Sequence, residues 1–161
     1  MTNWLLRRAR LADNLPLQDV LIRSGRIERI GVNLPTPPDG VPEWNLAGRV
    51  LLPGLVDLHT HLDKTYSTLE NQSGTLLEAI QVWGRFKQQR TPLELADVVR
   101  RALRTAIANG VTALRSHIDI GEARDLAAVE TLLALRRELS GLIDLQFVAL
   151  AFRPIAQSGM R

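Results

Sequence analysis

Two histidines separated by one threonine, His59 and His61, are the residues best suited to chemistry in this sequence. They end a largely continuous apolar run, RVLLPGLVDL over 49–58, of the kind that forms a strand buried on both faces. Because side chains alternate along a strand, both imidazoles share one face and can present two ligands to a single metal ion. For an isolated pair of this spacing, the favoured alternative is a pair of surface or core histidines that binds no ion.

The surrounding sequence shifts the balance toward a functional pair. His117 ends a second predicted strand, VTALRSH over 111–117, and in parallel α/β architectures functional groups gather where strands end. The chain has no cysteine, so a metal would have to be bound by histidines and carboxylates. Three carboxylates near these strand ends could orient the ligating histidines, or could equally cap helices or pair with Arg115: Asp57, Asp63 and Asp119.

The composition is that of a soluble globular protein with one core. The chain has 161 residues, of which 45% are hydrophobic and 23% charged, and its formal net charge is +3. These values exclude intrinsic disorder, and the lack of cysteine excludes a disulfide scaffold. Basic residues are spread along the chain and aromatic residues make up only 4%, which argues against nucleic-acid binding. No apolar run has the length of a signal peptide or membrane span, so we expect a cytoplasmic protein without a membrane partner.

The first third of the sequence predicts a small β element. Residues 17–31 alternate apolar and polar side chains around Ser24-Gly25, which is typical of a hairpin with a tight turn. Four prolines within eight residues then indicate a loop or linker: Pro35, Pro37, Pro38 and Pro42. We therefore predict a domain boundary near residue 48, with a first domain over 1–49 and a second over 50–161.

The second domain is predicted to alternate strands and helices. Two capping boxes, Thr75–Glu78 and Thr91–Glu94, indicate helices that end near Arg90 and at Asn109-Gly110. The other predicted elements are a strand over 111–117, a helix over 123–140 and a strand over 143–150. Strands that alternate with helices in this way pair in parallel through right-handed crossovers.

These motifs resemble those of a known family. The segment LLPGLVDLHTHLDKT (51–65) resembles the first barrel strand of the amidohydrolase superfamily, whose His-X-His pair supplies metal ligands inside a (β/α)8 barrel. Three later segments are similar to successive landmarks of cytosine deaminase and its close relatives: NQSGTL (71–76), IANGVTALRSHID (107–119) and LIDLQFVA (142–149). The hairpin over 17–31 likewise resembles strands of the small β-sandwich beside that barrel. The resemblance implies an α/β fold, a partial (β/α)8 TIM barrel of about three βα units preceded by a small β-sandwich element.

The resemblance also implies which residues would bind a metal. His59 and His61 would be ligands of a divalent metal ion, with iron or zinc the usual occupant. In related deaminases the histidine corresponding to His117 lies near the site without being a principal ligand. Lys64, which follows the histidine pair, is expected to be a solvated loop charge.

For the substrate, the resemblance implies a small nitrogen heterocycle of the pyrimidine type. Leu76 would be an apolar contact to the ring, and Gln157 would be the amide that binds it. The family usually has Phe-Pro-Gln where this chain reads FRPIAQ over 152–157, an apparent insertion before that amide. In a complete enzyme the metal would lower the pKa of bound water toward about 7, and the resulting hydroxide would attack the ring carbon that carries the exocyclic amine.

Other parts of the family's site are not found in the sequence: a histidine and glutamate on the fifth strand, a histidine on the sixth and an aspartate on the eighth. A complete barrel takes roughly 250 residues, so we expect an N-terminal fragment that is inactive in isolation. Three parallel strands without neighbours expose a hydrogen-bonding edge. Such an edge favours aggregation, a homo-oligomer or pairing with a complementing C-terminal chain.

Two alternatives stay open at the level of sequence. The first is an amidohydrolase that acts on a triazine or another cyclic amide, because the histidine pair fixes the metal rather than the substrate. The second is a standalone, non-enzymatic α/β protein in which His59, His61 and His117 form a metal-binding or structural site.

Overall fold

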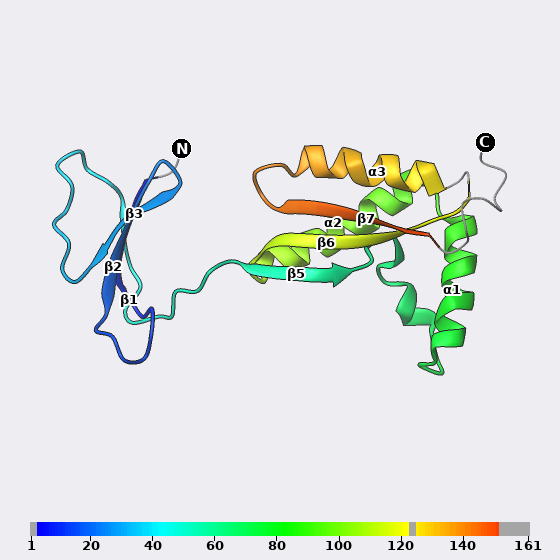
Figure 1. Ribbon diagram of the computed structural model, residues 1–161, viewed down its shortest axis with the longest axis horizontal. Coiled ribbons are helices and arrows are strands. Elements are labelled where there is room, and N and C mark those ends of the chain that lie inside the picture. The colour runs from blue at the N-terminus through cyan, green and yellow to red at the C-terminus, as the bar shows by residue number, and fades with distance from the viewer. Residues whose placement is uncertain (1–2, 123–124, 152–161) are drawn as a thin grey trace. The chain divides into compact units, whose positions relative to one another are not determined.

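The computed structural model describes residues 3–122 and 125–151 (Figure 1). The chain divides into two compact units, Met1–Pro53 and Gly54–Arg161. Within the described ranges, no helix combines the length and the apolar character needed to cross a membrane.

The first unit contains a four-stranded sheet with the strand order β3-β2-β1-β4. Its strands are β1 (Trp4–Ala9), β2 (Gln18–Arg23), β3 (Arg26–Gly31) and β4 (Glu43–Asn45). The predicted hairpin is confirmed, because β2 and β3 are antiparallel and Ser24 and Gly25 join them with φ of 51° and 75°. Two successive positive φ values are typical of a type I′ turn, whose twist matches that of the flanking strands.

Strand β4 begins directly after Pro42, the last of the prolines that predicted a loop or linker. It pairs in parallel with β1, next to a hydrogen bond of 2.9 Å from the Leu5 amide to the Pro42 carbonyl. A strand of three residues is too short to show an alternation of apolar and polar side chains in the sequence. It forms because the edge of β1 provides its hydrogen-bond partners. Leu5, Leu21 and Val41 form the core of the unit. The described residues form a single sheet here, and the β-sandwich stays a prediction.

The second unit is a mixed α/β fold around a sheet with the strand order β5-β6-β7. All of its strands are parallel, as the alternation of strands and helices predicted. Its elements are β5 (Leu55–Thr60), the 3-10 helices η1 (Leu62–Lys64) and η2 (Ser67–Glu70), α1 (Leu76–Gln89), α2 (Pro92–Ala108), β6 (Val111–Ile120), α3 (Asp125–Glu138) and β7 (Asp144–Ala151).

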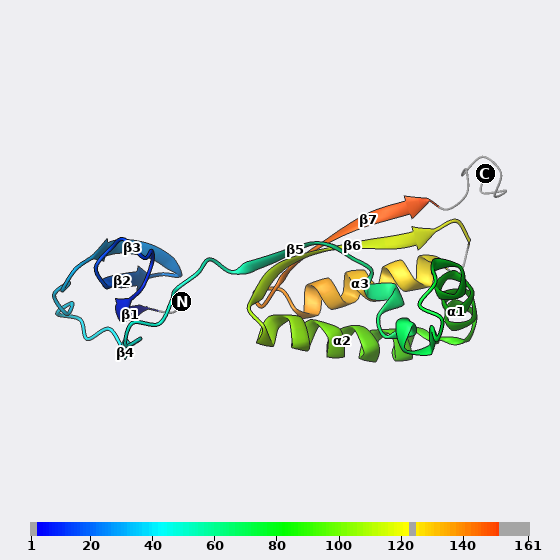
Figure 2. The same cartoon turned by 90° about the horizontal axis from the view of Figure 1, so that it is seen from below.

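Helices α2 and α3 lie on the same side of this sheet, and α1 lies near the end toward which the strands point (Figure 2). Under α2 and α3 is the larger core, which consists of Leu62, Leu95, Ala96, Val99, Leu103, Leu114, Ile118, Leu132, Leu135, Ile143 and Leu145. The prediction that the first strand is buried on both faces is wrong, because Leu55, Val56 and Leu58 are 52%, 57% and 65% exposed. In the described sheet β5 is an edge strand that pairs only with β6, and little covers its side chains.

The helix starts follow the sequence signals, with one difference. The Thr91–Glu94 capping box is complete. At α1 the Thr75 side chain accepts from the Glu78 amide, but the Glu78 carboxylate accepts from the Ser73 amide at 2.6 Å instead of closing the box. Both first turns are capped, and α1 therefore begins where the sequence predicted.

Candidate functional site

The two histidines of the motif converge at the C-terminal end of β5. His59 lies on β5 and His61 directly follows it, and their Nε2 atoms are 3.4 Å apart. Two nitrogens that each lie 2.0–2.1 Å from a tetrahedral zinc ion are separated by about 3.4 Å. The spacing of the pair therefore fits two ligands of one metal ion.

The tautomer of His61 is fixed by its other ring nitrogen. His61 Nδ1 lies 3.0 Å from the carbonyl oxygen of His117, which can only accept, so Nδ1 carries the proton and Nε2 the lone pair. Burial, reinforced by the nearby Lys64 ammonium, lowers the pKa of His61 below its usual value. His61 is therefore neutral near pH 7, which is the form that binds metals.

His117 comes close to both other histidines without joining them as a third ligand. Its ring stacks on that of His59, with centroids 4.2 Å apart and an interplanar angle of 29°. Its Nδ1 atom is buried and has no hydrogen-bond partner. Across residues 3–122 and 125–151, no group of three histidine, aspartate or glutamate side chains is arranged to hold a metal. The three-histidine alternative stays a prediction.

The three candidate carboxylates make other contacts. The Asp57 carboxylate accepts from the backbone amide of His59 at 3.1 Å. Asp119 forms an ion pair of 2.8 Å with Lys64 and accepts from the Trp83 indole at 3.0 Å. Asp63 accepts from the Asp119 amide at 3.4 Å. These contacts hold the chain around the histidine pair, and a role in orienting the imidazoles stays a prediction.

Lys64 is not the solvated loop charge that the sequence led us to expect. Its side chain is 22% exposed, it is paired with Asp119, and its Nζ atom lies 3.5 Å from His61 Nδ1. The ammonium group is drawn inward because Asp119, on the neighbouring strand β6, is itself 6% exposed and needs a counter-ion.

Asp63 is the most unusual carboxylate of the site. It is 2% exposed, and its Oδ1 atom has no hydrogen-bond partner. Burial, with a smaller contribution from Asp119, raises the pKa of Asp63 to about 6, although Lys64 opposes the shift. A buried carboxylate that is only partly paired resists ionisation because its charge loses the solvation of water.

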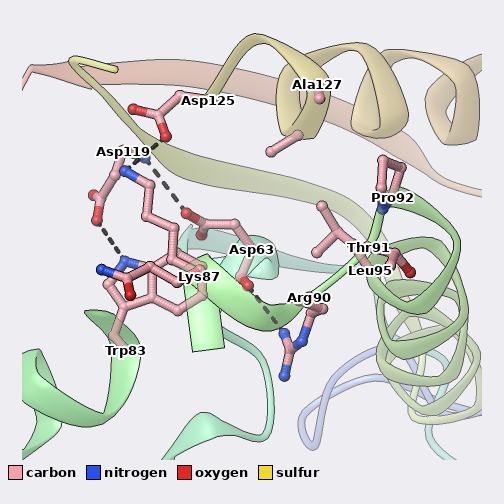
Figure 3. Close-up of a pocket in the computed structure, with 12 residues that line it drawn as sticks. Asp63, Trp83, Lys87, Arg90, Thr91, Pro92, Leu95, Asp119, Asp125 and Ala127 are labelled. Atoms are coloured by element: carbon pink, nitrogen blue, oxygen red, sulfur yellow. Dashed lines mark hydrogen bonds and ion pairs between the residues drawn. The ribbon is translucent and has the colours of Figure 1, made fainter. Parts of the chain in front are cut away.

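Beside this group is a cavity of about 250 Å³ (Figure 3). The side chains of Asp63, Asp119, Asp125, Trp83 and Lys87 line it together with others of α1 and α2. Lys87 extends from α1 to form an ion pair of 2.6 Å with Asp125 at the start of α3. These contacts fix the C-terminal half of α1 against the end of the sheet.

A larger cleft of about 900 Å³ opens next to His61. Its walls combine apolar side chains of α1 with charged groups, and they include His61, Lys64, Leu76, Ile80 and Trp83. Leu76, the predicted apolar contact to a ring, therefore lines the same cleft as one histidine of the pair. Gln157, the predicted amide contact, lies outside the described residues.

Sequence reasoning missed Trp83 and Lys87 as members of the site. Both belong to α1 and are four residues apart, so they lie on one face of the helix. The sequence feature that could have identified them is the placement of a tryptophan and a lysine on the same face of a predicted helix. Their partners, Asp119 and Asp125, are 36 and 38 positions away in the chain, beyond any local pattern.

Comparisons with known proteins give a consistent result, although no family model matches the chain. The chain is 30% identical to N-isopropylammelide isopropyl amidohydrolase of Pseudomonas sp. (strain ADP) over 91% of its own length and 38% of the relative's. The crystal structure of 5-methylcytosine deaminase from Klebsiella pneumoniae, liganded with 5-fluorocytosine, is similar with a TM-score of 0.79 and 32% identity, over 90% of this chain and 36% of that one.

A more distant structure supports the fold alone. Atrazine chlorohydrolase from Arthrobacter aurescens TC1, complexed with zinc, has a TM-score of 0.61 at 20% identity, over 91% of this chain and 35% of that one. The chain thus spans 38% of the curated relative and 35–36% of these two solved structures.

Proposed function

We propose that this chain forms the first three βα units of a metal-dependent hydrolase barrel, preceded by part of a small β-sandwich. The chain belongs to the amidohydrolase superfamily and matches the N-terminal portion of its relatives. The whole protein would remove an amine from a nitrogen heterocycle by hydrolysis. The observation that carries the proposal is the separation of 3.4 Å between the two Nε2 atoms of His59 and His61.

His59 and His61 would hold the divalent ion, zinc or iron. When bound, such an ion activates water as a nucleophile near neutral pH. The chain's own part is to hold the proton of His61 on Nδ1, against the His117 carbonyl, so that Nε2 stays free to bind. The cleft beside His61 would take the ring, with Leu76 as an apolar wall.

The isolated chain is proposed to bind metal weakly and to be inactive. Catalytic zinc sites use about three protein ligands and an open position, and the described residues offer two converging imidazoles. The proton transfer to the departing amine also needs a positioned general acid. Both would come from the rest of a complete barrel.

The substrate is proposed to be a cytosine-like pyrimidine, and a second candidate is a triazine. The structural similarity to 5-methylcytosine deaminase favours the first. The relative that aligns with 91% of this chain acts, by its name, on N-isopropylammelide, and this favours the second. The described part of the cleft is apolar and charged and would accommodate either ring.

The exposed edge strand β5 is proposed to pair with a complementing chain or with a second copy. Leu55, on one face of the strand, and Val56 and Leu58, on the other, each expose more than half of their surface, and in the described sheet the strand pairs on one side only. Large exposed apolar patches mark interfaces or aggregation sites. Sedimentation velocity at several concentrations tests for pairing with a second copy, and a monodisperse monomer throughout would contradict that form of the proposal.

The metal site is tested with Co²⁺, whose visible absorption reports coordination. We expect the full chain to bind Co²⁺ and the double variant His59→Ala/His61→Ala to lose at least about tenfold in affinity. The matched control is Asp39→Asn, which removes an exposed carboxylate of the first unit. Equal binding by the double variant and the control would refute the site.

A further inference from the structure

One residue, His117, contacts both histidines of the proposed pair. Its ring stacks on His59 with centroids 4.2 Å apart, and its carbonyl oxygen lies 3.0 Å from His61 Nδ1. We propose that His117 is a positioning residue whose ring shape orients His59 and whose carbonyl orients His61, so that both Nε2 atoms face one point. The inference rests on the proposed function, because the convergence of the two Nε2 atoms matters only if both bind the same ion.

The stacking contact restrains a side chain that otherwise has little to hold it. His59 lies on the edge strand β5, among neighbours that are largely exposed, and an exposed histidine samples several rotamers. A flat ring against its face, at an interplanar angle of 29°, removes most of that freedom. Less conformational entropy is then lost when a metal binds.

The Nδ1 atom of His117 adds little to this role. Its Nδ1 atom is buried without a hydrogen-bond partner, so packing, rather than a polar contact at this atom, holds the ring. A buried, unpaired nitrogen costs free energy relative to a carbon at the same place. A flat apolar ring is therefore expected to position His59 as well as the imidazole does.

The carbonyl of His117 is held by the sheet itself. Residue 117 lies within the β6–β7 ladder, opposite Val148. The neighbouring Ser116 side chain accepts from the Leu62 amide at 2.9 Å, which ties the turn after His61 to β6. The position of the His61 ring thus depends on the register of β5 and β6 as well as on contacts within its own loop, where the Lys64 amide donates to the His61 carbonyl at 3.1 Å.

A positioning role and a ligand role for His117 predict different effects of substitution. If the ring acts by shape, His117→Phe keeps the Co²⁺ affinity of the chain and His117→Ala loses it. If a His117 nitrogen binds the ion, both variants lose Co²⁺ affinity equally. His117→Leu, apolar but not flat, should lie between Phe and Ala, and it replaces the Ala variant if that variant does not fold by far-UV circular dichroism.

The experiment uses the full chain with two readouts. With Co²⁺, we expect His117→Phe to stay within about threefold of the unsubstituted affinity with the same absorption spectrum, and His117→Ala to bind about 10–100-fold more weakly. Without metal, NMR should show cross-relaxation between the rings of His59 and His61 in the unsubstituted chain and in His117→Phe, and its loss in His117→Ala.

The two readouts separate this inference from the proposed function. If the unsubstituted chain binds no Co²⁺, the proposed metal site fails, and the metal-free NMR comparison still decides whether His117 positions His59. Equal losses in the Phe and Ala variants, or no loss in the Ala variant by either readout, would overturn the positioning role.

Discussion

Each unit of the molecule contains a buried aspartate within a charged cluster, and the two clusters are paired to different degrees. In the first unit Asp19 is 4% exposed, and it accepts from Arg7 at 2.9 Å and from the amides of Arg8 and Leu34 at 2.9 and 3.0 Å. Arg7 also forms a bidentate pair with Glu43, with both bonds at 2.9 Å. Both oxygens of the Asp19 carboxylate therefore have partners.

In the second unit Asp63 is as little exposed to solvent as Asp19, but it lies deeper among protein atoms and is left with one unpaired oxygen. The consequence is visible in the pKa values. Burial raises the pKa of both carboxyls, but at Asp19 the hydrogen bonds from Arg8, Arg7 and Leu34 outweigh burial and leave the pKa below its ordinary value. At Asp63 burial prevails, and the pKa is about 6. The pKa of a carboxylate with little solvent exposure therefore depends both on how deeply it is buried and on how many hydrogen bonds its charged form accepts.

The two clusters are therefore expected to affect stability differently. Hydrogen bonds to the charged form of Asp19 stabilise the first unit, whereas the partly paired charge of Asp63, next to the candidate metal ligands, costs stability. This comparison leads to three predictions about stability, in addition to the tests of metal binding and of His117.

The largest effect is expected when the paired cluster is broken. Arg7→Met leaves Asp19 buried without its counter-ion, and we expect the first unit to lose about 3 kcal/mol of unfolding free energy. Urea denaturation followed by the fluorescence of Trp4 and Trp44, in a Trp83→Phe background, measures this unit. Arg23→Met, which breaks pairs with the exposed Asp39 and Glu28, is the control and should cost clearly less. Equal losses of unfolding free energy in Arg7→Met and Arg23→Met would contradict the distinction between the buried and the exposed ion pairs.

A smaller effect of opposite sign is expected at Asp63. Its folded pKa lies above the unfolded value, so ionisation at pH 7 costs stability, and the cost disappears as the pH falls from about 6 to below 4. Asp63→Asn should therefore stabilise the metal-free second unit at pH 7 by about 2 kcal/mol. The variant should also lack the increase in unfolding free energy that protonation of Asp63 gives the unsubstituted unit as the pH falls. Trp83 fluorescence in a Trp4→Phe/Trp44→Phe background reports it. Destabilisation at pH 7 would show that the charge is instead compensated.

The smallest effect is the acid response of the first unit. The folded pKa of Asp19 lies below its unfolded value, so its contribution is present above about pH 4 and is lost as the pH falls through the folded pKa. We expect the first unit to lose stability between pH 5 and 3, and Asp19→Asn to weaken this dependence without abolishing it, because Arg7 and Thr36 also lower the pKa of Glu43, to about 2. The contributions of Asp19 and Asp63, each measured as the difference between the unsubstituted chain and its Asn variant, should thus change with acid in opposite directions, and a parallel change would contradict the comparison.

Much of the local architecture could be predicted from the sequence. The turn at Ser24-Gly25 and the capping box at Thr91 depend on residues within a few positions of one another, and both are confirmed. The short strand β4 and the exposure of β5 could not be predicted. The first depends on a distant partner strand, and the second on what covers a sheet edge.

By itself the sequence determined that His59 and His61 lie on the same face of one strand end, because the alternation of side chains along a strand is a local rule. Only the tertiary structure decided what surrounds them: the ring of His117 against His59, and Asp119 beside Lys64. The physical reason is that these partners are separated by 55 or more positions and meet through the register of parallel strands, which no local pattern of residues specifies.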